Sequence, residues 1–170
     1  MPGVPKEAYE LGAFIVRSCS TVGTATDGGF GERRPDMIDG SCLCKGIRFR
    51  IVGRHSEISM CHCSLCRKTT GGGPASEITV DGGGFVWLAG QELVAEGPKH
   101  SFCRNCGCHA PYLLADGKTN VPIGALDGAP AIPIGRHIYV DSKASWDVIG
   151  EDGATRYPEK GEPLPLNRAD

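Results

Sequence analysis

The sequence lacks a long apolar run. No stretch approaches the ~20 consecutive apolar residues that a membrane-spanning helix needs. The apolar segment Ala13–Val16 is too short for the core of a signal peptide and is followed by polar residues. These absences predict a protein with no membrane partner and no secretory route, so we expect a reducing, cytoplasmic location.

The chain also lacks an excess of either charge. It has 18 Lys and Arg residues against 20 Asp and Glu residues, which gives a formal net charge of −2. Such a chain has no overall basic field to attract nucleic acid or an anionic membrane. We therefore expect no nucleic-acid partner, although a local basic cluster could still guide a small anion.

Glycine and proline, by contrast, are abundant, with 25 and 12 copies in 170 residues. They favour short elements joined by tight turns, and the predicted fold class is mainly β. A one- to two-turn helix is predicted over Ser64–Thr70, stopped by the glycines at Gly71–Gly73. Six short runs predict strands: Ile47–Val52, Ser76–Val80, Phe85–Ala89, Ala110–Leu114, His137–Val140 and Ser145–Ile149.

The two ends of the chain differ from its middle. Residues 1–36 mix Ser, Thr, Gly and charged residues without sustained periodicity, which predicts a flexible N-terminal arm. Cys19 lies in this arm, and we expect an exposed thiol without a role. Residues 159–170 predict a loose C-terminal tail, which leaves residues 37–158 as the folded domain.

Nine cysteines are present, and eight of them gather in three clusters with the spacings C-x-C, C-x-C-x-x-C and C-x-x-C-x-C. A C-x-x-C pair wraps a turn so that both sulfurs reach one ion at ~2.3 Å, and a C-x-C pair on an extended segment points both sulfurs to one face. Soft thiolates select zinc, copper(I) or iron–sulfur clusters, and the usual iron–sulfur spacings are absent. Zinc is therefore the predicted cofactor, as two ions.

The simplest partition of these cysteines makes one closed and one open metal site. Four thiolates form a closed, structural site, whereas three thiolates leave the fourth position to water or substrate. The predicted closed site joins Cys42, Cys44, Cys103 and Cys106, and the predicted open site joins Cys61, Cys63 and Cys66. Cys108 could supply a fourth sulfur to the second site, and its spacing leaves both possibilities open.

Seven motifs together resemble, in order and spacing, the glutathione-dependent formaldehyde-activating (GFA) family, also called the centromere protein V/Gfa domain. They are DGSCLCKGIRFRI, MCHCSLCRKTTGG, WLAG, HSFCRNCGCH, IGALDG, HIYV and SWDVI, and they span about Asp39–Ile149. The resemblance implies a Mss4-like (β-tent) fold, with short antiparallel sheets around one structural and one catalytic zinc ion. By motif position it assigns the four-cysteine set to the structural ion and Cys61, Cys63 and Cys66 to the catalytic one. Cys108 departs from the family pattern, where a small or hydroxyl residue is common.

The resemblance also implies an activity. Founding members of the family are S-(hydroxymethyl)glutathione synthases, which are carbon–sulfur lyases. We therefore expect a zinc-dependent enzyme that joins or splits a thiol, glutathione or a similar one, and a small aldehyde such as formaldehyde. The alternatives are a thiol-binding carrier and a non-catalytic zinc scaffold. The oligomeric state stays open, since exposed edge strands could pair two subunits into a homodimer.

Glutathione carries two carboxylates, so its binding site should offer cations. The basic residues nearest to the predicted ligands are Arg67, Lys68 and Arg104. His62 and His109 lie beside predicted ligands and are weaker candidates for proton transfer. Trp87 and Trp146 are expected to fill the core.

Overall fold

The structure is a computed structural model that describes residues 37–167. The predicted arm at 1–36, with Cys19, and residues 168–170 lie outside the described residues. The described part contains twelve short β-strands and one α-helix, which confirms the predicted mainly β class. In this part of the chain, no helix is long and apolar enough to cross a membrane.

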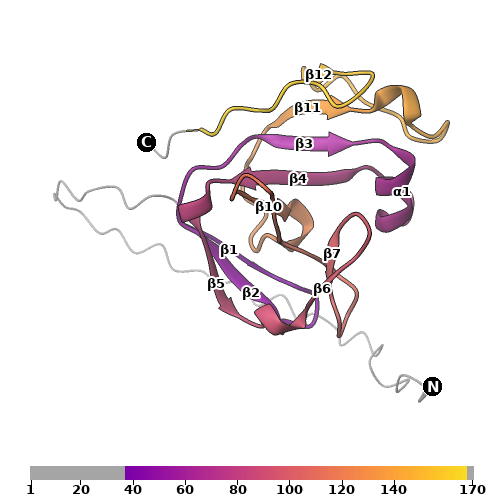
Figure 1. The fold of residues 1–170 in the computed structure, drawn as a ribbon. Coiled ribbons are helices and arrows are strands. Elements are labelled where there is room, and N and C mark those ends of the chain that lie inside the picture. The colour runs from indigo at the N-terminus through magenta and orange to yellow at the C-terminus, as the bar shows by residue number, and fades with distance from the viewer. Residues whose placement is uncertain (1–36, 168–170) are drawn as a thin grey trace, which may run out of the picture. The chain divides into compact units, whose positions relative to one another are not determined.

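Six strands form the largest sheet, in the order β12-β11-β3-β4-β10-β9 (Figure 1). Their bounds are Ile58–Cys61 for β3, Ala75–Val80 for β4, Tyr112–Leu113 for β9, Thr119–Pro122 for β10, Ile134–Ile138 for β11 and Thr155–Arg156 for β12. The pairs among β3, β4, β10 and β9 are antiparallel, but β11 runs parallel to both β3 and β12. This parallel pairing sets Cys61, the last residue of β3, beside Ile138, the last residue of β11.

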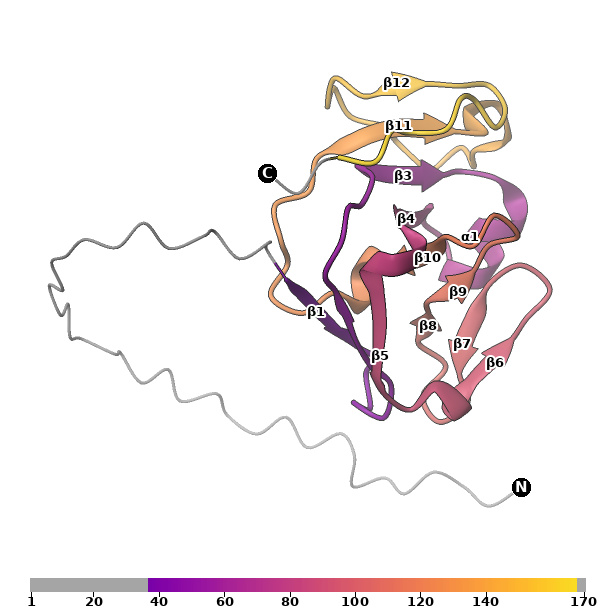
Figure 2. The same cartoon turned by 60° about the vertical axis from the view of Figure 1, so that its left-hand side comes forward.

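Two antiparallel three-stranded sheets complete the fold, in the orders β1-β2-β5 and β6-β7-β8 (Figure 2). Their bounds are Ile38–Ser41 for β1, Arg48–Ile51 for β2, Phe85–Ala89 for β5, Val94–Glu96 for β6, Ser101–Cys103 for β7 and His109–Ala110 for β8. Four single 3-10 turns lie between strands: η2 (Gly82–Gly84), η3 (Gln91–Leu93), η4 (Ile123–Ala125) and η5 (Val140–Ser142). The turn after β1 and the turn after β7 both carry cysteines.

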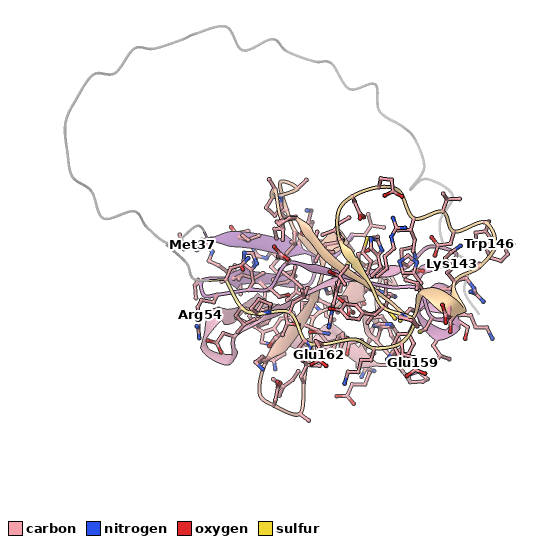
Figure 3. All side chains as sticks on the ribbon, turned by 90° about the horizontal axis from the view of Figure 1, so that it is seen from above. Met37, Arg54, Lys143, Trp146, Glu159 and Glu162 are labelled. Atoms are coloured by element: carbon pink, nitrogen blue, oxygen red, sulfur yellow. The ribbon has the colours of Figure 1, made fainter. Side chains whose placement is uncertain are left out.

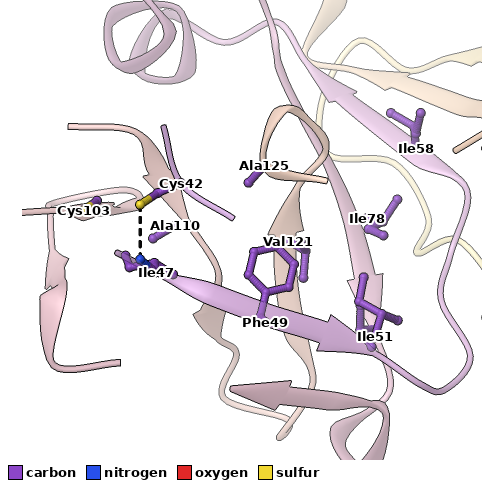
Figure 4. Close-up of a cluster of buried hydrophobic side chains, with 11 residues drawn as sticks. Cys42, Ile47, Phe49, Ile51, Ile58, Ile78, Cys103, Ala110, Val121 and Ala125 are labelled. Carbon is purple, nitrogen blue, oxygen red and sulfur yellow. Dashed lines mark hydrogen bonds between the residues drawn. The ribbon is translucent and has the colours of Figure 1, made fainter. Parts of the chain in front are cut away.

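The hydrophobic core lies between the β1-β2-β5 sheet and the largest sheet. Its largest fully buried apolar side chains come from β2, β4 and β10 and from the turn before β2: Ile47, Phe49, Ile51, Ile78, Val80 and Val121 (Figure 4). The Phe49 ring stacks on Phe85 at a centroid distance of 5.3 Å, and Phe85 meets Trp87 edge to face at 4.9 Å. The alternation of apolar and charged residues in β2 buries Phe49 and Ile51 and leaves Arg48 exposed, as a half-buried strand requires.

The helix α1 (Ser64–Thr70) is bounded by side-chain and backbone caps. Cys63 occupies the N-cap position and accepts a hydrogen bond from the backbone N–H of Cys66. Gly71 ends the helix in the left-handed conformation, with φ of 81°, and its N–H donates to the carbonyl of Arg67. Glycine adopts this backbone without a Cβ clash, which explains why the predicted helix stops here. The predicted helix is thus confirmed.

Three of the six predicted strands are confirmed, as β2, β4 and β5. The predicted strand His137–Val140 is confirmed only at His137 and Ile138, because Tyr139 is left-handed and Val140 begins a 3-10 turn. The predicted strand Ala110–Leu114 is split into β8 and β9 by Pro111, which has no N–H to donate to a ladder. Ser145–Ile149 forms a turn and irregular backbone instead of a strand. Trp146, expected in the core, is 69% exposed and lies at the periphery (Figure 3), whereas Trp87 packs against Phe85 as expected.

The predicted tail begins at Glu159, and its described part is hydrogen-bonded to the folded domain. The carbonyl of Glu159 accepts from the N–H of Tyr139, and Asn167 donates its N–H to the carbonyl of His55 at 2.9 Å. Arg136 on β11 also donates to the carbonyl of Glu162. These hydrogen bonds hold residues 159–167 against the rest of the domain.

Candidate metal centres and the adjoining cavity

Four cysteines from two distant turns converge. We call Cys42, Cys44, Cys103 and Cys106 the four-cysteine group, and their sulfurs all lie within 4.8 Å of one another. Four sulfurs at ~2.3 Å around a tetrahedral ion are about 3.8 Å apart, and the Cys44 to Cys103 sulfur distance is 3.9 Å. The sulfurs are therefore close enough to share one zinc-sized ion.

The backbone of both turns supports this convergence. The N–H of Ile47 donates to the Cys42 sulfur at 3.2 Å (Figure 4). In the second turn, Gly107 takes a φ of 71° and donates its N–H to the carbonyl of Cys103 at 2.8 Å. The glycine after Cys106 is thus needed for the left-handed turn that brings Cys106 back beside Cys103.

Within the four-cysteine group, the pKa values of Cys44 and Cys106 shift in opposite directions. Burial raises the pKa of Cys106, but backbone hydrogen bonds from Cys108 and Cys44 outweigh it and lower this pKa to about 6. A backbone hydrogen bond from Gly46 lowers the pKa of Cys44, yet the neighbouring thiols, Cys42 first, raise it to about 12. A bound dication would remove this conflict by stabilising every thiolate at once, so the donor set fits zinc.

A second group forms at the junction of β3 and α1. We call Cys61, Cys63 and Cys66 the three-cysteine group, and their sulfurs also lie within 4.8 Å of one another. Cys61 ends β3, Cys63 caps the helix and Cys66 lies buried in its first turn, so strand, cap and helix each supply one sulfur. This group too has a donor set that fits a soft, tetrahedral metal ion.

The pKa values of Cys61 and Cys66 in this group also shift in opposite directions. A hydrogen bond from Cys66 lowers the pKa of Cys61 to about 6, against the effect of burial, and the positive charge of Lys99 contributes in the same direction. The same contact with Cys61, together with burial, raises the pKa of Cys66. Lys99, which the sequence reasoning did not single out, therefore acts on this group from the turn between β6 and β7.

Cys108 lies outside both groups among the described residues. Its sulfur donates to the carbonyl of His109 at 3.4 Å, and burial raises its pKa. It lines a cavity of about 410 Å³ together with Thr69, Thr70 and His109. The structure thus brings together seven of the eight cysteines predicted as ligands and leaves Cys108 apart from them.

A buried histidine approaches the three-cysteine group from the other side. His100, whose side chain is 4% exposed, places Nε2 at 3.4 Å from the Cys66 sulfur and Nδ1 at 3.1 Å from Glu77 Oε1. The other carboxylate oxygen of Glu77 accepts from the Tyr112 hydroxyl at 2.9 Å and from Asn120 Nδ2 at 3.2 Å. Because a carboxylate accepts and does not donate, His100 donates its Nδ1–H to Glu77, and its Nε2 atom faces the Cys66 sulfur.

His100 and Lys99 also line a cavity of about 530 Å³. This volume is in the range of small-molecule sites. The wall is mixed, with aromatic rings, hydroxyls and both signs of charge: Phe85, Trp87, Gln91, Val94, Glu96, Gly97, Lys99, His100, Ser101, Pro111, Tyr112, Leu113 and Thr119. The cavity therefore meets the three-cysteine group at His100.

The three basic residues predicted to bind substrate are Arg67, Lys68 and Arg104, and their surroundings differ. Arg67 donates to the carbonyl of Ser142 at 3.2 Å and lies over the Trp146 ring at 5.7 Å. Lys68 and Arg104 are exposed, and none of the three lines the cavity beside His100.

Two further buried histidines, His62 and His137, connect the three-cysteine group to Asp147 and Asp152. His62 lies between Cys61 and Cys63, with Nδ1 at 2.6 Å from Asp147 Oδ2 and Nε2 at 2.8 Å from His137 Nδ1. His137 Nε2 in turn lies 2.7 Å from Asp152 Oδ2. We call these four residues the aspartate–histidine chain.

The aspartate–histidine chain engages every ring nitrogen of its two histidines. The ring centroids of His62 and His137 are 5.1 Å apart, which fits an edge-to-edge N–H···N bond. The orientation of the His62 ring is therefore fixed from both of its nitrogens.

Comparison with known proteins identifies a family. The family described as "Glutathione-dependent formaldehyde-activating enzyme" matches residues 37–142. A Halomonas elongata protein, provisionally described as such an enzyme, is 35% identical over 82 residues, which cover 41% of this chain and 52% of that protein. The chain thus aligns with about half the length of that relative.

The solved structures include a Rhodobacter sphaeroides protein that matches with a TM-score of 0.42 and 22% identity, over 55% of this chain and 91% of that one. The family match covers more than half of the chain and contains both cysteine groups. The chain belongs to the glutathione-dependent formaldehyde-activating enzyme family.

Proposed function

We propose that the protein is a zinc-dependent carbon–sulfur lyase of the S-(hydroxymethyl)glutathione synthase type. It would join or split a thiol, glutathione or a close analogue, and a small aldehyde such as formaldehyde, in a reducing compartment such as the cytoplasm. The four-cysteine group would hold a structural zinc ion and the three-cysteine group a catalytic one. The proposal excludes nucleic acid and membranes as partners and leaves the number of subunits open.

One observation carries this proposal. The three-cysteine group has three converging sulfurs, no fourth cysteine among the described residues, and a ligand-sized cavity that meets it at His100. Three protein ligands and an open position are the arrangement of catalytic zinc sites, whereas the four-cysteine group is closed. When bound there, zinc would lower the pKa of an incoming thiol and polarise an aldehyde oxygen.

The residues around the group have defined roles in this proposal. His100 Nε2 would accept the hydrogen of the incoming thiol, because this atom lies on the sulfur side of the ring and Glu77 accepts from Nδ1 on the other side. The thiolate then attacks the aldehyde carbon and the new alkoxide takes the hydrogen back from His100, which yields the hemithioacetal without any oxidation. Lys99 attracts a carboxylate of the thiol, taking the place of the residues first predicted, Arg67, Lys68 and Arg104.

The test is exchange between formaldehyde and S-(hydroxymethyl)glutathione, followed by two-dimensional exchange NMR on the zinc-loaded full chain. We expect wild type to exceed the uncatalysed exchange rate, and Cys63→Ser to lose both one zinc ion and this acceleration. Cys108→Ser is the matched control and should retain two zinc ions and the wild-type rate. Saturable thiol binding without acceleration would show a carrier, and no thiol binding at all would favour a scaffold.

A further inference from the structure

The aspartate–histidine chain takes its two carboxylates from a segment that follows the residues matched by the family. The family match ends at residue 142, and Asp147 and Asp152 lie beyond it. Both histidines belong to the largest sheet or its immediate end: His137 is on β11, and His62 directly follows β3. The aspartate–histidine chain thus connects His62, between Cys61 and Cys63, to residues 143–156.

Polar contacts, and little apolar burial, hold this segment. Trp146 and Val148 are 69% and 85% exposed, while the Asp147 side chain between them is only 14% exposed. The indole of Trp146 donates to the carbonyl of Gly72 at 3.3 Å, and β12 adds a short parallel pairing with β11. The contacts of Asp147 with His62, at 2.6 Å, and of Asp152 with His137, at 2.7 Å, therefore anchor this segment inward.

His62 in turn determines the geometry of the Cys61–Cys63 turn. It is the single residue between two sulfur donors, so a rotation of its backbone moves both sulfurs. Its N–H donates to the carbonyl of Ile138 at 3.0 Å, and its ring is held at both nitrogens. A side chain that is 2% exposed and bonded at both nitrogens has one orientation available.

We propose that Asp147 and Asp152 are positioning residues for the three-cysteine group. They clamp the His62 and His137 rings from opposite ends and thereby determine how fast this group releases its metal ion. The inference rests on the proposed metal site in the three-cysteine group and does not depend on turnover of any substrate. Asp147 contacts His62 directly and Asp152 acts through His137, so Asp147 has the larger effect.

The experiment measures zinc release from the zinc-loaded full chain to an excess of the chromogenic chelator 4-(2-pyridylazo)resorcinol. Two kinetic phases are expected, and Cys63→Ser identifies the phase of the three-cysteine group because that phase disappears in it. Asp147→Ala should accelerate this phase about tenfold, which is the lower end of the effect of losing a direct outer partner of a metal ligand, because Asp147 acts one residue away, through His62. Asp152→Ala should accelerate it less, and the phase of the four-cysteine group should stay unchanged in both variants.

The matched control is Asp116→Ala, because Asp116 pairs only with Lys118 at an exposed turn among the described residues. It should release zinc from both groups at wild-type rates. The double variant of Asp147 and Asp152 should show less than the product of the two single effects, since both act through one histidine pair. If an alanine variant fails to fold, Asp147→Asn keeps the size of the side chain and an acceptor oxygen, and a smaller acceleration of the same phase is expected.

Three results would overturn the inference: wild-type release in both Asp variants, equal acceleration of both phases, or fully independent effects in the double variant. A missing phase in wild type would mean that the three-cysteine group holds no zinc, and the inference would fail together with that part of the proposed function. Selective acceleration in a protein that shows no thiol–aldehyde exchange would support the clamp and refute the lyase. The two proposals are therefore separable.

Discussion

Glu77 carries three hydrogen bonds behind the three-cysteine group, so its replacement by alanine tests the whole network. His100 Nδ1, the Tyr112 hydroxyl and Asn120 Nδ2 all donate to its carboxylate, and the side chain is 14% exposed. A net contribution of about 1 kcal/mol for each bond gives a loss of about 3 kcal/mol in the free energy of unfolding. For a domain of this size that loss lowers the unfolding midpoint by roughly 10 °C.

The assay is urea unfolding of the zinc-loaded protein, combined with the exchange NMR described above. Tyr112→Phe removes one donor to Glu77 and should cost about 1 kcal/mol. Glu77→Gln keeps the shape, so we expect a smaller loss of stability but a clear loss of exchange, because the His100 ring loses its carboxylate partner. Glu92→Ala is the control, since Glu92 is exposed and makes no side-chain hydrogen bond within the described residues. If Glu77→Ala unfolds within about 0.5 kcal/mol of wild type, the network does not hold His100 as argued.

Three other predictions follow from single features. Cys103→Ser should lower the free energy of unfolding more than Cys63→Ser, because the four-cysteine group joins Cys44 to Cys103, 59 positions apart, whereas the three-cysteine group closes a single turn. Urea unfolding of the two variants compares the losses, and equal losses would contradict this reason. Gly71→Ala should cost about 1 kcal/mol in thermal unfolding, since open space surrounds Gly71 and only its φ of 81° opposes a side chain, so an unchanged midpoint would argue against the left-handed cap. The hydrogen bond with Arg50 lowers the pKa of Asp39. The stabilising effect of this bond is therefore present above the unfolded pKa of Asp39 and is lost as the pH falls through its lowered folded pKa. The difference in the free energy of unfolding between wild type and Asp39→Asn should vanish on acidification, and a difference that stays constant with pH would refute the role of Arg50.

Local spacing could predict which cysteines act together within a turn, because a C-x-C or C-x-x-C pair carries its geometry there. Spacing left open which turns combine around one ion, and the predicted partition was the simplest one. His100, Glu77 and Tyr112 could not be found in the same manner. They come from different strands or turns, and only the tertiary fold brings them beside Cys66.

The segment Ser145–Ile149 shows a different reason for failure. The sequence predicts a strand here, with Trp146 in the core. In the structure the side chains of Trp146 and Val148 face outward and Asp147 faces inward. The buried partner His62 reverses the usual preference, because a hydrogen bond to a buried ring stabilises an inward carboxylate. Periodicity contains no information about such a partner.

The parallel pairing of β3 with β11 has a consequence for the synthesis of the chain. His137 follows His62 by 75 residues and Asp147 follows it by 85. On the ribosome, the sulfurs of Cys61, Cys63 and Cys66 emerge long before the strand and the carboxylate that hold their turn. At synthesis rates of about 5–20 residues per second, these thiols spend several seconds without their neighbours. Early capture of a metal ion would protect them from oxidation and from pairing with the wrong cysteine during that interval.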